Sequence, residues 1–175
     1  MVHYTQVSSD EELHQILALQ QLNLAKNLVP EEVIHQGFVT VEHDFDILRL
    51  LNKKHPHTIA KDKNMVVGYA LSMHPTFKDT IPVLKPMFAE IEKLKIPVNF
   101  MAMGQICIAK SHRGQGLFRG LYKAMKHYLP ETIESIITEV DCTNKRSMQA
   151  HKTIGFKELL RYSADGKKWS LIMLK

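Results

Sequence analysis

The chain has 175 residues, of which 45% are apolar and 23% are charged, with a formal net charge of +5 and a pI of about 9.1. These values are typical of one globular domain and exclude disordered and fibrous proteins. No apolar run approaches the roughly 18 residues of a membrane span, no secretory signal is visible, and two cysteines cannot build a disulfide framework. We therefore expect a cytoplasmic protein that does not bind membranes.

The first hundred residues predict helices placed between strands. Ser9 and the acids after it form a helix start, because a serine cap and early carboxylates stabilise the first turn. Pro30 favours the start of a second helix and Gly37 its end. The expected elements are a strand over 2–7, helices from 9, 30 and 44, a strand pair over 58–61 and 65–73, and a helix over 83–94 with Pro86 in its first turn.

The second half begins with a strand over 98–109 that is apolar on both faces, which is typical of a central strand buried on both sides. Gly104 within it indicates a bulge or a close approach to the backbone. A glycine-rich loop, a helix to about Tyr128, a strand over 134–141 and a helix over 144–153 follow. The chain ends in a hairpin over 158–163 and 168–174, turned by Asp165-Gly166. We predict one α/β domain over residues 1–175, with a mixed sheet.

The loop Arg113-Gly114-Gln115-Gly116 lies where the central strand turns into a helix. The first turn of a helix has unpaired N–H groups and partial positive charge, and glycines let a phosphate approach them. Arg113 and Arg119 add charge. The P-loop and dinucleotide patterns both fail here, since no Gly-Lys-Ser/Thr follows and Arg119 stands at the third glycine position. The loop therefore predicts a phosphate cradle, or serves only as a turn.

Two motifs resemble those of the GNAT superfamily of N-acetyltransferases. Residues 113–120, Arg-Gly-Gln-Gly-Leu-Phe-Arg-Gly, resemble its acyl-CoA signature Gln/Arg-x-x-Gly-x-Gly/Ala, with Phe118 as a departure at the last position. Asn144, Ser147, His151 and Gly155-Phe156 resemble its later motif Asn-x-x-Ala/Ser-x-x-x-Tyr-x-x-x-Gly-Phe. The resemblance covers roughly residues 98–160. It implies a splayed, mostly antiparallel central sheet flanked by helices, with acyl-CoA in the splay.

The resemblance also implies which residues hold the cofactor, expected to be acetyl-CoA. The backbone of the central strand should meet the pantetheine arm, the loop amides should hold the pyrophosphate, and the later motif should lie near the cofactor arm. The implied cofactor residues are Ile106, Cys107, Ile108, Arg113, Gly114, Gln115, Gly116, Leu117, Phe118, Arg119, Gly120, Asn144 and Ser147.

Two residues are candidates for proton transfer. Glu139 lies at a position where some protein N-terminal acetyltransferases of the family have a general base, and burial among apolar neighbours would raise its pKa. A salt-bridged or exposed glutamate is the alternative. His151 stands where the family often has a tyrosine acid, although an ordinary pKa of about 6.5 leaves it mostly neutral at pH 7. A mere spacer role is its alternative.

These residues predict an enzyme that transfers an acetyl group from acetyl-CoA to an amine on a small molecule or a protein. A non-catalytic acyl-CoA-binding module, used as a sensor or an interaction domain, is the alternative. Cys107 and Cys142 are interpreted as small buried hydrophobes, and the histidines show no ligand set with metal spacing. Nucleic-acid binding is not expected, because no recognition motif is present. Homodimers are common in the family, and the sequence leaves that question open.

Overall fold

The structure is a computed structural model that describes residues 1–96 and 99–175, so the predicted strand residue Val98 lies outside the described part. Seven strands form one sheet in the order β1-β2-β3-β4-β5-β7-β6. The strands are β1 (Val2–Gln6), β2 (Thr58–Asp62), β3 (Met65–Met73), β4 (Phe100–Ile108), β5 (Ser135–Asp141), β6 (Lys157–Ala164) and β7 (Lys167–Leu174). The helices are α1 (Asp10–Gln21), α2 (Pro30–Gln36), α3 (Phe45–Lys54), α4 (Lys85–Leu94), α5 (Leu117–Tyr128) and α6 (Lys145–Thr153). Short 3₁₀ turns are η1 (Ala25–Asn27), η2 (Pro75–Phe77), η3 (Pro82–Leu84) and η4 (Lys110–His112).

The helix starts follow from local capping, as predicted. The side chains of Ser9, Asp44 and Asn144 each accept a backbone hydrogen bond in the first turn of their helix, at 3.3, 2.9 and 3.1 Å. Pro30 is the first residue of α2, and Gly37 ends that helix with φ 74°. Each cap satisfies a donor that the first helical turn leaves unpaired, so these boundaries depend on sequence alone.

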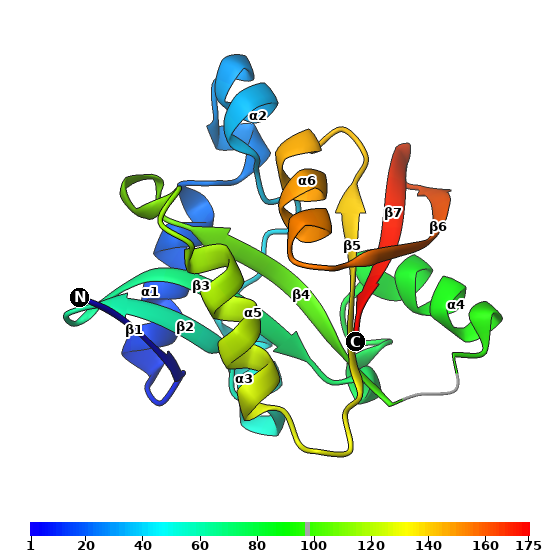
Figure 1. Cartoon of the computed structure of the whole chain (residues 1–175), viewed down its shortest axis with the longest axis horizontal. Helices are drawn as coiled ribbons and strands as arrows, with labels where there is room; N and C mark the ends of the chain where they lie inside the picture. The colour runs from blue at the N-terminus through cyan, green and yellow to red at the C-terminus, as the bar shows by residue number, and fades with distance from the viewer. Residues whose placement is uncertain (97–98) are drawn as a thin grey trace.

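Helices cover both faces of the sheet (Figure 1). Helices α1 and α3 pack on β2, β3 and β4 through one apolar cluster, and α4 packs on β4, β5 and β7 through a second cluster on the same face. Helix α5 covers the opposite face through a third cluster, which Met148 and Ile154 of the α6 region join. The central strand β4 is therefore covered on both sides, which explains its apolar sequence.

The sheet splays between β4 and β5, its one parallel pair. The two strands pair only over Phe100–Ala102 and Ser135–Ile137, and Figure 1 shows their upper ends diverging. At the vertex the Thr138 hydroxyl donates to the carbonyl oxygen of Met103 at 2.7 Å. Ala70 of β3 pairs with Ile106 of β4, and Ser72 pairs with Met103, so the pairing advances by two residues on β3 and by three on β4. One extra residue therefore bulges β4 at 104–105, where Gly104 predicted it.

The terminal hairpin also forms as predicted. Strands β6 and β7 pair antiparallel, and Asp165 and Gly166 take the positive φ values of 51° and 71° that a tight hairpin turn requires. The hairpin extends the sheet beyond β5, because β7 pairs with β5 from Ile136 to Asp141. The result is a mixed α/β fold with a mostly antiparallel sheet that opens on one side of β4.

Candidate active site

The glycine-rich loop forms an open cradle at the start of α5. Gly114 and Gly116 have φ values of 74° and 81°, and a Cβ placed on either would meet nothing within 4 Å. The first backbone hydrogen bond of α5 runs from the Gly120 N–H to the Gly116 carbonyl oxygen at 3.1 Å. The N–H groups of residues 117–119 therefore precede the helical bonding pattern and can bind an anion.

Gly120 differs from its predicted cofactor role. Its N–H is used inside the helix, and a Cβ at this position would lie 2.0 Å from the hydroxyl oxygen of Tyr4. The absence of a side chain therefore lets Tyr4 of β1 pack against α5. Since the helix begins at Leu117, the useful amides end at Arg119, three residues into the helix.

A cleft of about 290 Å³ opens beside this cradle. Ten of the predicted cofactor residues line it: Ile106, Cys107, Ile108, Arg113, Gly114, Gly116, Leu117, Phe118, Asn144 and Ser147. Gln115 instead braces the loop by donating to the Ser111 carbonyl oxygen at 3.0 Å, and the Arg119 side chain is exposed. Arg146 also lines the cleft, a residue that sequence reasoning missed although it stands two positions after the motif asparagine.

The end of β4 presents to the cleft a backbone edge that pairs with no other described strand, and on this edge the Ile108 carbonyl oxygen accepts from Arg113. Ala109 donates to the Val67 carbonyl oxygen of the neighbouring strand at 2.8 Å, and Cys107 stands opposite Tyr69 in the same ladder. Because strand residues alternate in direction, Ile106 and Ile108 turn their N–H and C=O groups toward the splay. An extended ligand can hydrogen bond there as an added strand.

Cys107 itself is buried, and burial raises the pKa of its thiol to about 12. A thiol of that kind stays protonated at neutral pH and is a poor nucleophile. Its packing in the cluster with α1 and α3 agrees with the interpretation as a small buried hydrophobe.

Arg113 turns its guanidinium toward protein groups. Nε donates to the Ile108 carbonyl oxygen at 3.2 Å, Nη2 to the Asn23 side-chain oxygen at 2.6 Å, and Nη1 to the carbonyl oxygen of Gln36 at 3.2 Å. The residue thus ties the signature loop to Gln36, where α2 ends and the following segment begins. The predicted contribution of its side chain to phosphate binding would require these bonds to be exchanged.

That segment, residues 36–43, crosses the open side of the splay, and we call it the strap. Three further side chains hold its carbonyl oxygens. Asn144 Nδ2 donates to Phe38 at 2.9 Å, Gln105 Nε2 to Val41 at 2.7 Å, and Gln20 Nε2 to His43 at 2.9 Å. The strap therefore lies between the two sheet halves, anchored by residues from α1, β4, α6 and the signature loop.

A second, smaller cavity of about 70 Å³ lies in the splay itself. Its lining comes from β4, β5, the strap, α4 and Trp169 of β7. It shares Phe38, Val39, Ile106, Asn144 and Ser147 with the larger cleft. The two spaces therefore adjoin at the point where the strap meets α6.

Glu139 lines this second cavity. Burial raises the pKa of its carboxyl group to about 7, and a hydrogen bond from the Tyr162 hydroxyl to Oε2 acts in the opposite direction. Glu139 is half-buried and forms no salt bridge within the described residues, whereas the alternative interpretation was a salt-bridged or exposed glutamate. A group with this pKa exchanges protons near neutral pH.

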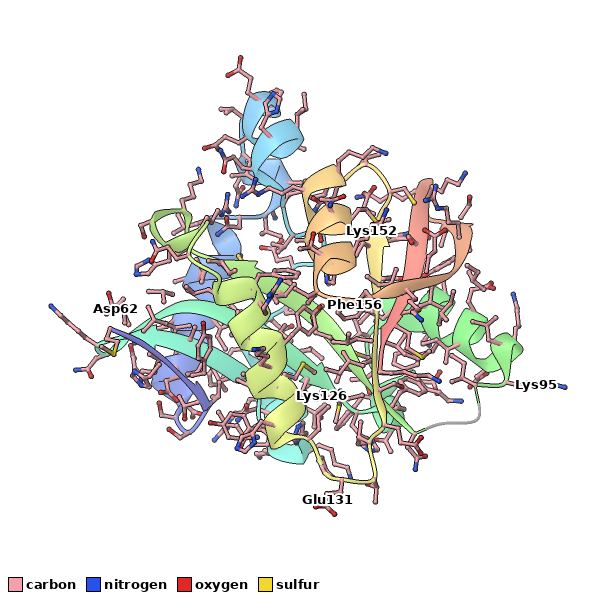
Figure 2. The ribbon with its side chains drawn as sticks, viewed as in Figure 1. Asp62, Lys95, Lys126, Glu131, Lys152 and Phe156 are labelled. Atoms are coloured by element: carbon pink, nitrogen blue, oxygen red, sulfur yellow. The ribbon has the colours of Figure 1, made fainter. Side chains whose placement is uncertain are left out.

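His151 is also in the cavity lining, but both of its ring nitrogens are occupied. Nδ1 lies 2.8 Å from the Ser147 carbonyl oxygen, which can only accept, so Nδ1 carries the proton. Nε2 therefore accepts from the Tyr122 hydroxyl at 2.7 Å. Burial lowers the pKa of the ring to about 4, and the ring packs edge-on against Phe118 and Phe156. Figure 2 labels Phe156 beside the end of α6.

Sequence comparison matches residues 19–156 to the model of the acetyltransferase (GNAT) family. The chain belongs to the GNAT acetyltransferase family. No curated protein matches it. Its relatives by fold include the ribosomal-protein-S18-alanine N-acetyltransferase from Escherichia coli, at 10% identity and a TM-score of 0.66, covering 99% of this chain and 93% of that one.

Two other solved structures share the fold. A chain in the NatC complex bound to Gag peptide and CoA is 14% identical, with a TM-score of 0.69 and coverage of 99% of this chain and 97% of that chain. The yncA protein from Salmonella typhimurium, with its cofactor acetyl-CoA, is 12% identical, with a TM-score of 0.66 and coverage of 100% and 94%. These likenesses confirm the predicted fold, and family membership confirms acyl transfer as its chemistry.

Within the described residues, 1–96 and 99–175, no helix combines the length and the apolar character that crossing a bilayer requires. Within the same residues, no group of three or more histidine, cysteine, aspartate or glutamate side chains is arranged to hold a metal ion.

Proposed function

We propose that this GNAT-family protein transfers an acetyl group from acetyl-CoA to an amine by direct attack. The observation that carries the proposal is the position of Glu139, whose carboxyl group lines a cavity adjoining the cofactor cleft. The raised pKa of about 7 suits a base for an ammonium group.

The cleft fits acyl-CoA in its donors and in its shape. The N–H groups of residues 117–119 face an open cradle for the pyrophosphate, and Ile106 offers strand hydrogen bonds to an amide-bearing arm. Apolar side chains of Leu117 and Phe118 line the same cleft. When bound, acetyl-CoA supplies the acetyl group in a form activated as a thioester.

In this proposal Glu139 removes a proton from the acceptor ammonium. Above pH 7 the carboxyl is mostly ionised and can accept that proton, while its burial keeps it a stronger base than an exposed glutamate. The cavity walls hold the amine beside the cleft, and this proximity provides most of the rate. We assign His151 a structural role, because its neutral ring holds Ser147 and Tyr122 and has no free donor for the cavity.

The acceptor is proposed to be an amine on a small molecule or on a protein. The cavity combines apolar walls from Leu84, Met87 and Trp169 with the carboxyl groups of Glu139 and Asp141. Such walls suit a cationic amine next to an apolar group. The names of two structural relatives, an S18-alanine N-acetyltransferase and a peptide-bound NatC complex, support protein amines as acceptors.

Cofactor binding is tested by thermal melting with and without acetyl-CoA. Ligand at a hundred times its Kd adds about 2.7 kcal/mol, which raises Tm by roughly 5–10 °C for a chain of this length. Gly116→Val should abolish the shift, because it places a side chain at φ 81° in the open cradle. Circular dichroism checks that the variant folds, and no shift in the wild type would contradict the cofactor.

Turnover is tested with a panel of amines and peptides and acetyl-CoA. Glu139→Gln should bind acetyl-CoA as the wild type does and lose acetyl transfer by roughly 10²–10⁴-fold, the usual contribution of a general base. Glu134→Gln, an exposed substitution just before the same strand, is the matched control. Cofactor binding without transfer to any acceptor would favour the non-catalytic acyl-CoA-binding module instead.

A further inference from the structure

Strand β6 contains a bulge that decides which of its side chains faces Glu139. Glu158 pairs with Ile172 of β7, but Leu160 pairs with Leu171, so Leu159 is an extra residue in β6. Such an extra residue reverses the faces of all later side chains in the strand. Every residue of β6 after Leu159 is therefore turned to the opposite face from that of a regular hairpin.

The consequence concerns Tyr162 and Arg161. Tyr162 pairs with Trp169, which itself pairs with Asp141 two residues beyond Glu139. Side chains of paired strand residues share a face, so the bulge puts Tyr162 on the face of Glu139. A regular strand would place Arg161 opposite Trp169 instead. In the structure Arg161 faces away and binds Glu158 through Nε at 2.9 Å.

The phenol of Tyr162 reaches across β7 and hydrogen bonds to Oε2 of Glu139. The ring packs against the apolar cluster beneath α4, which includes Ile137 of β5 and Leu171 of the intervening strand β7. Oε1 of Glu139 has no hydrogen-bond partner among the described residues, and Glu139 lines the smaller cavity. One carboxylate oxygen is thus held and the other is available to a ligand.

We propose that Tyr162 is a positioning residue for Glu139, and that the β6 bulge provides a neutral phenol at this position in place of the Arg161 cation. This inference rests on the proposed role of Glu139 as the base. The phenol fixes Oε2 and directs Oε1 toward the acceptor. An arginine at the same place would form an ion pair with the carboxylate and weaken it as a base.

The other charged and titratable groups around the pair come from β5, β7, α4, α6 and the hairpin turn. Asp141 on β5 lines the cavity and lies 3.6 Å from Lys167 Nζ of β7. Glu90 of α4 and Asp165 of the hairpin turn act on Tyr162, and their negative charge raises the pKa of the phenol further. His151 of α6 is neutral, and the cavity-lining strap residues 38–41 carry no titratable side chain. The phenol therefore stays protonated and remains the donor.

The experiment measures the pKa of Glu139 directly, by the pH dependence of its side-chain carboxyl carbon signal in ¹³C-glutamate-labelled protein. Glu139→Gln assigns the signal. Tyr162→Phe should raise the midpoint by roughly 1 unit, since it removes a hydrogen bond to the charged form. Tyr162→Arg should lower it by roughly 1 unit or more. Tyr128→Phe, which removes a hydroxyl bonded to the Tyr4 carbonyl oxygen far from the cavity, should leave it unchanged.

The acidic limb of the pH profile of kcat/KM is recorded for the same proteins. Its midpoint should rise in Tyr162→Phe and fall in Tyr162→Arg, as the midpoint of the carbon signal does. Far-UV circular dichroism confirms that each variant keeps its fold. A Glu139 signal that titrates identically in wild type and Tyr162→Phe overturns the positioning role. Signals that shift as expected while the rate profile stays fixed support the pair and overturn the proposed base instead, so the two failures are distinguishable.

Discussion

Three buried histidines predict a fold that is destabilised by mild acid. His57 is fully buried, with Nε2 donating to the Leu48 carbonyl oxygen and Nδ1 accepting from the Ser72 N–H, both at 3.1 Å. Burial lowers its pKa to about 3. Burial likewise lowers the pKa of both His43 and His151 to about 4. In the unfolded chain these rings titrate near pH 6.5, so the unfolded state binds more protons below that pH and stability falls with pH.

The size of the effect follows from proton linkage. Between pH 7 and pH 5 each histidine costs the folded state about 2 kcal/mol, or about 6 kcal/mol for the three. Glu139 works in the opposite direction, because its pKa is raised from 4.5 to about 7 on folding. Because the folded state binds that proton at pH 5, Glu139 adds about 2 kcal/mol to the free energy of unfolding between pH 7 and pH 5. The net loss from these four groups is about 4 kcal/mol, a large part of the ~5–15 kcal/mol that stabilises an ordinary domain.

Urea unfolding at pH 7, 6 and 5 measures this loss, and the single tryptophan, Trp169, is a buried fluorescence reporter. His57→Gln keeps an amide donor and acceptor in place of the ring but cannot be protonated. It should therefore lose about 2 kcal/mol less than the wild type between pH 7 and 5. His35→Gln, at an exposed position in α2, is the control. Equal unfolding free energies at pH 7 and 5, or an unchanged loss in His57→Gln, would refute the reasoning.

Three further predictions concern packing and caps. Gly120→Ala should destabilise the fold by about 1–3 kcal/mol, because the new Cβ would lie 2.0 Å from the Tyr4 hydroxyl oxygen; calorimetry should show partial relief in the double variant with Tyr4→Ala. Asn144→Ala removes the α6 cap and a strap anchor, so stability should fall by about 1–2 kcal/mol and amide exchange in the strap should speed up. His151→Phe should lower stability by about 1–3 kcal/mol, because it leaves the buried Tyr122 hydroxyl without a hydrogen-bond acceptor. The kcat and its pH profile should stay unchanged. Loss of the alkaline limb of that profile would instead support His151 as the general acid.

The element boundaries and the conformation of the glycine-rich loop could be predicted because their causes are local. Ser9, Asp44 and Asn144 cap helices within a few residues of themselves, and the two glycines of the 114–116 loop adopt a conformation that their own backbones favour. The buried central strand was visible because apolar residues occupy both of its faces. Two motifs of fixed spacing then indicated the family, and the family model confirmed it.

The sequence misplaced Gly120 because the number of residues from the loop to the first helical bond is a detail of the folded turn. The sequence also did not predict the strap. Its anchors, Arg113, Gln105 and Asn144, reach it from positions 64 to 106 residues away, so only the folded sheet brings them together. None of these contacts leaves a periodic pattern in the chain.

For the two candidate proton-transfer residues, too, the sequence indicated the position and the tertiary structure decided the chemistry. The sequence singled out Glu139 and His151 through the family resemblance, by their positions relative to Asn144 in its later motif. Only the tertiary structure decided their protonation, since a pKa depends on burial and on partners distant in sequence. Burial raises the pKa of the Glu139 carboxyl group to about 7. Burial lowers the pKa of His151 to about 4, so its hydrogen-bonded ring is neutral. A strand bulge placed that tyrosine, and register across a sheet is a property of the whole fold.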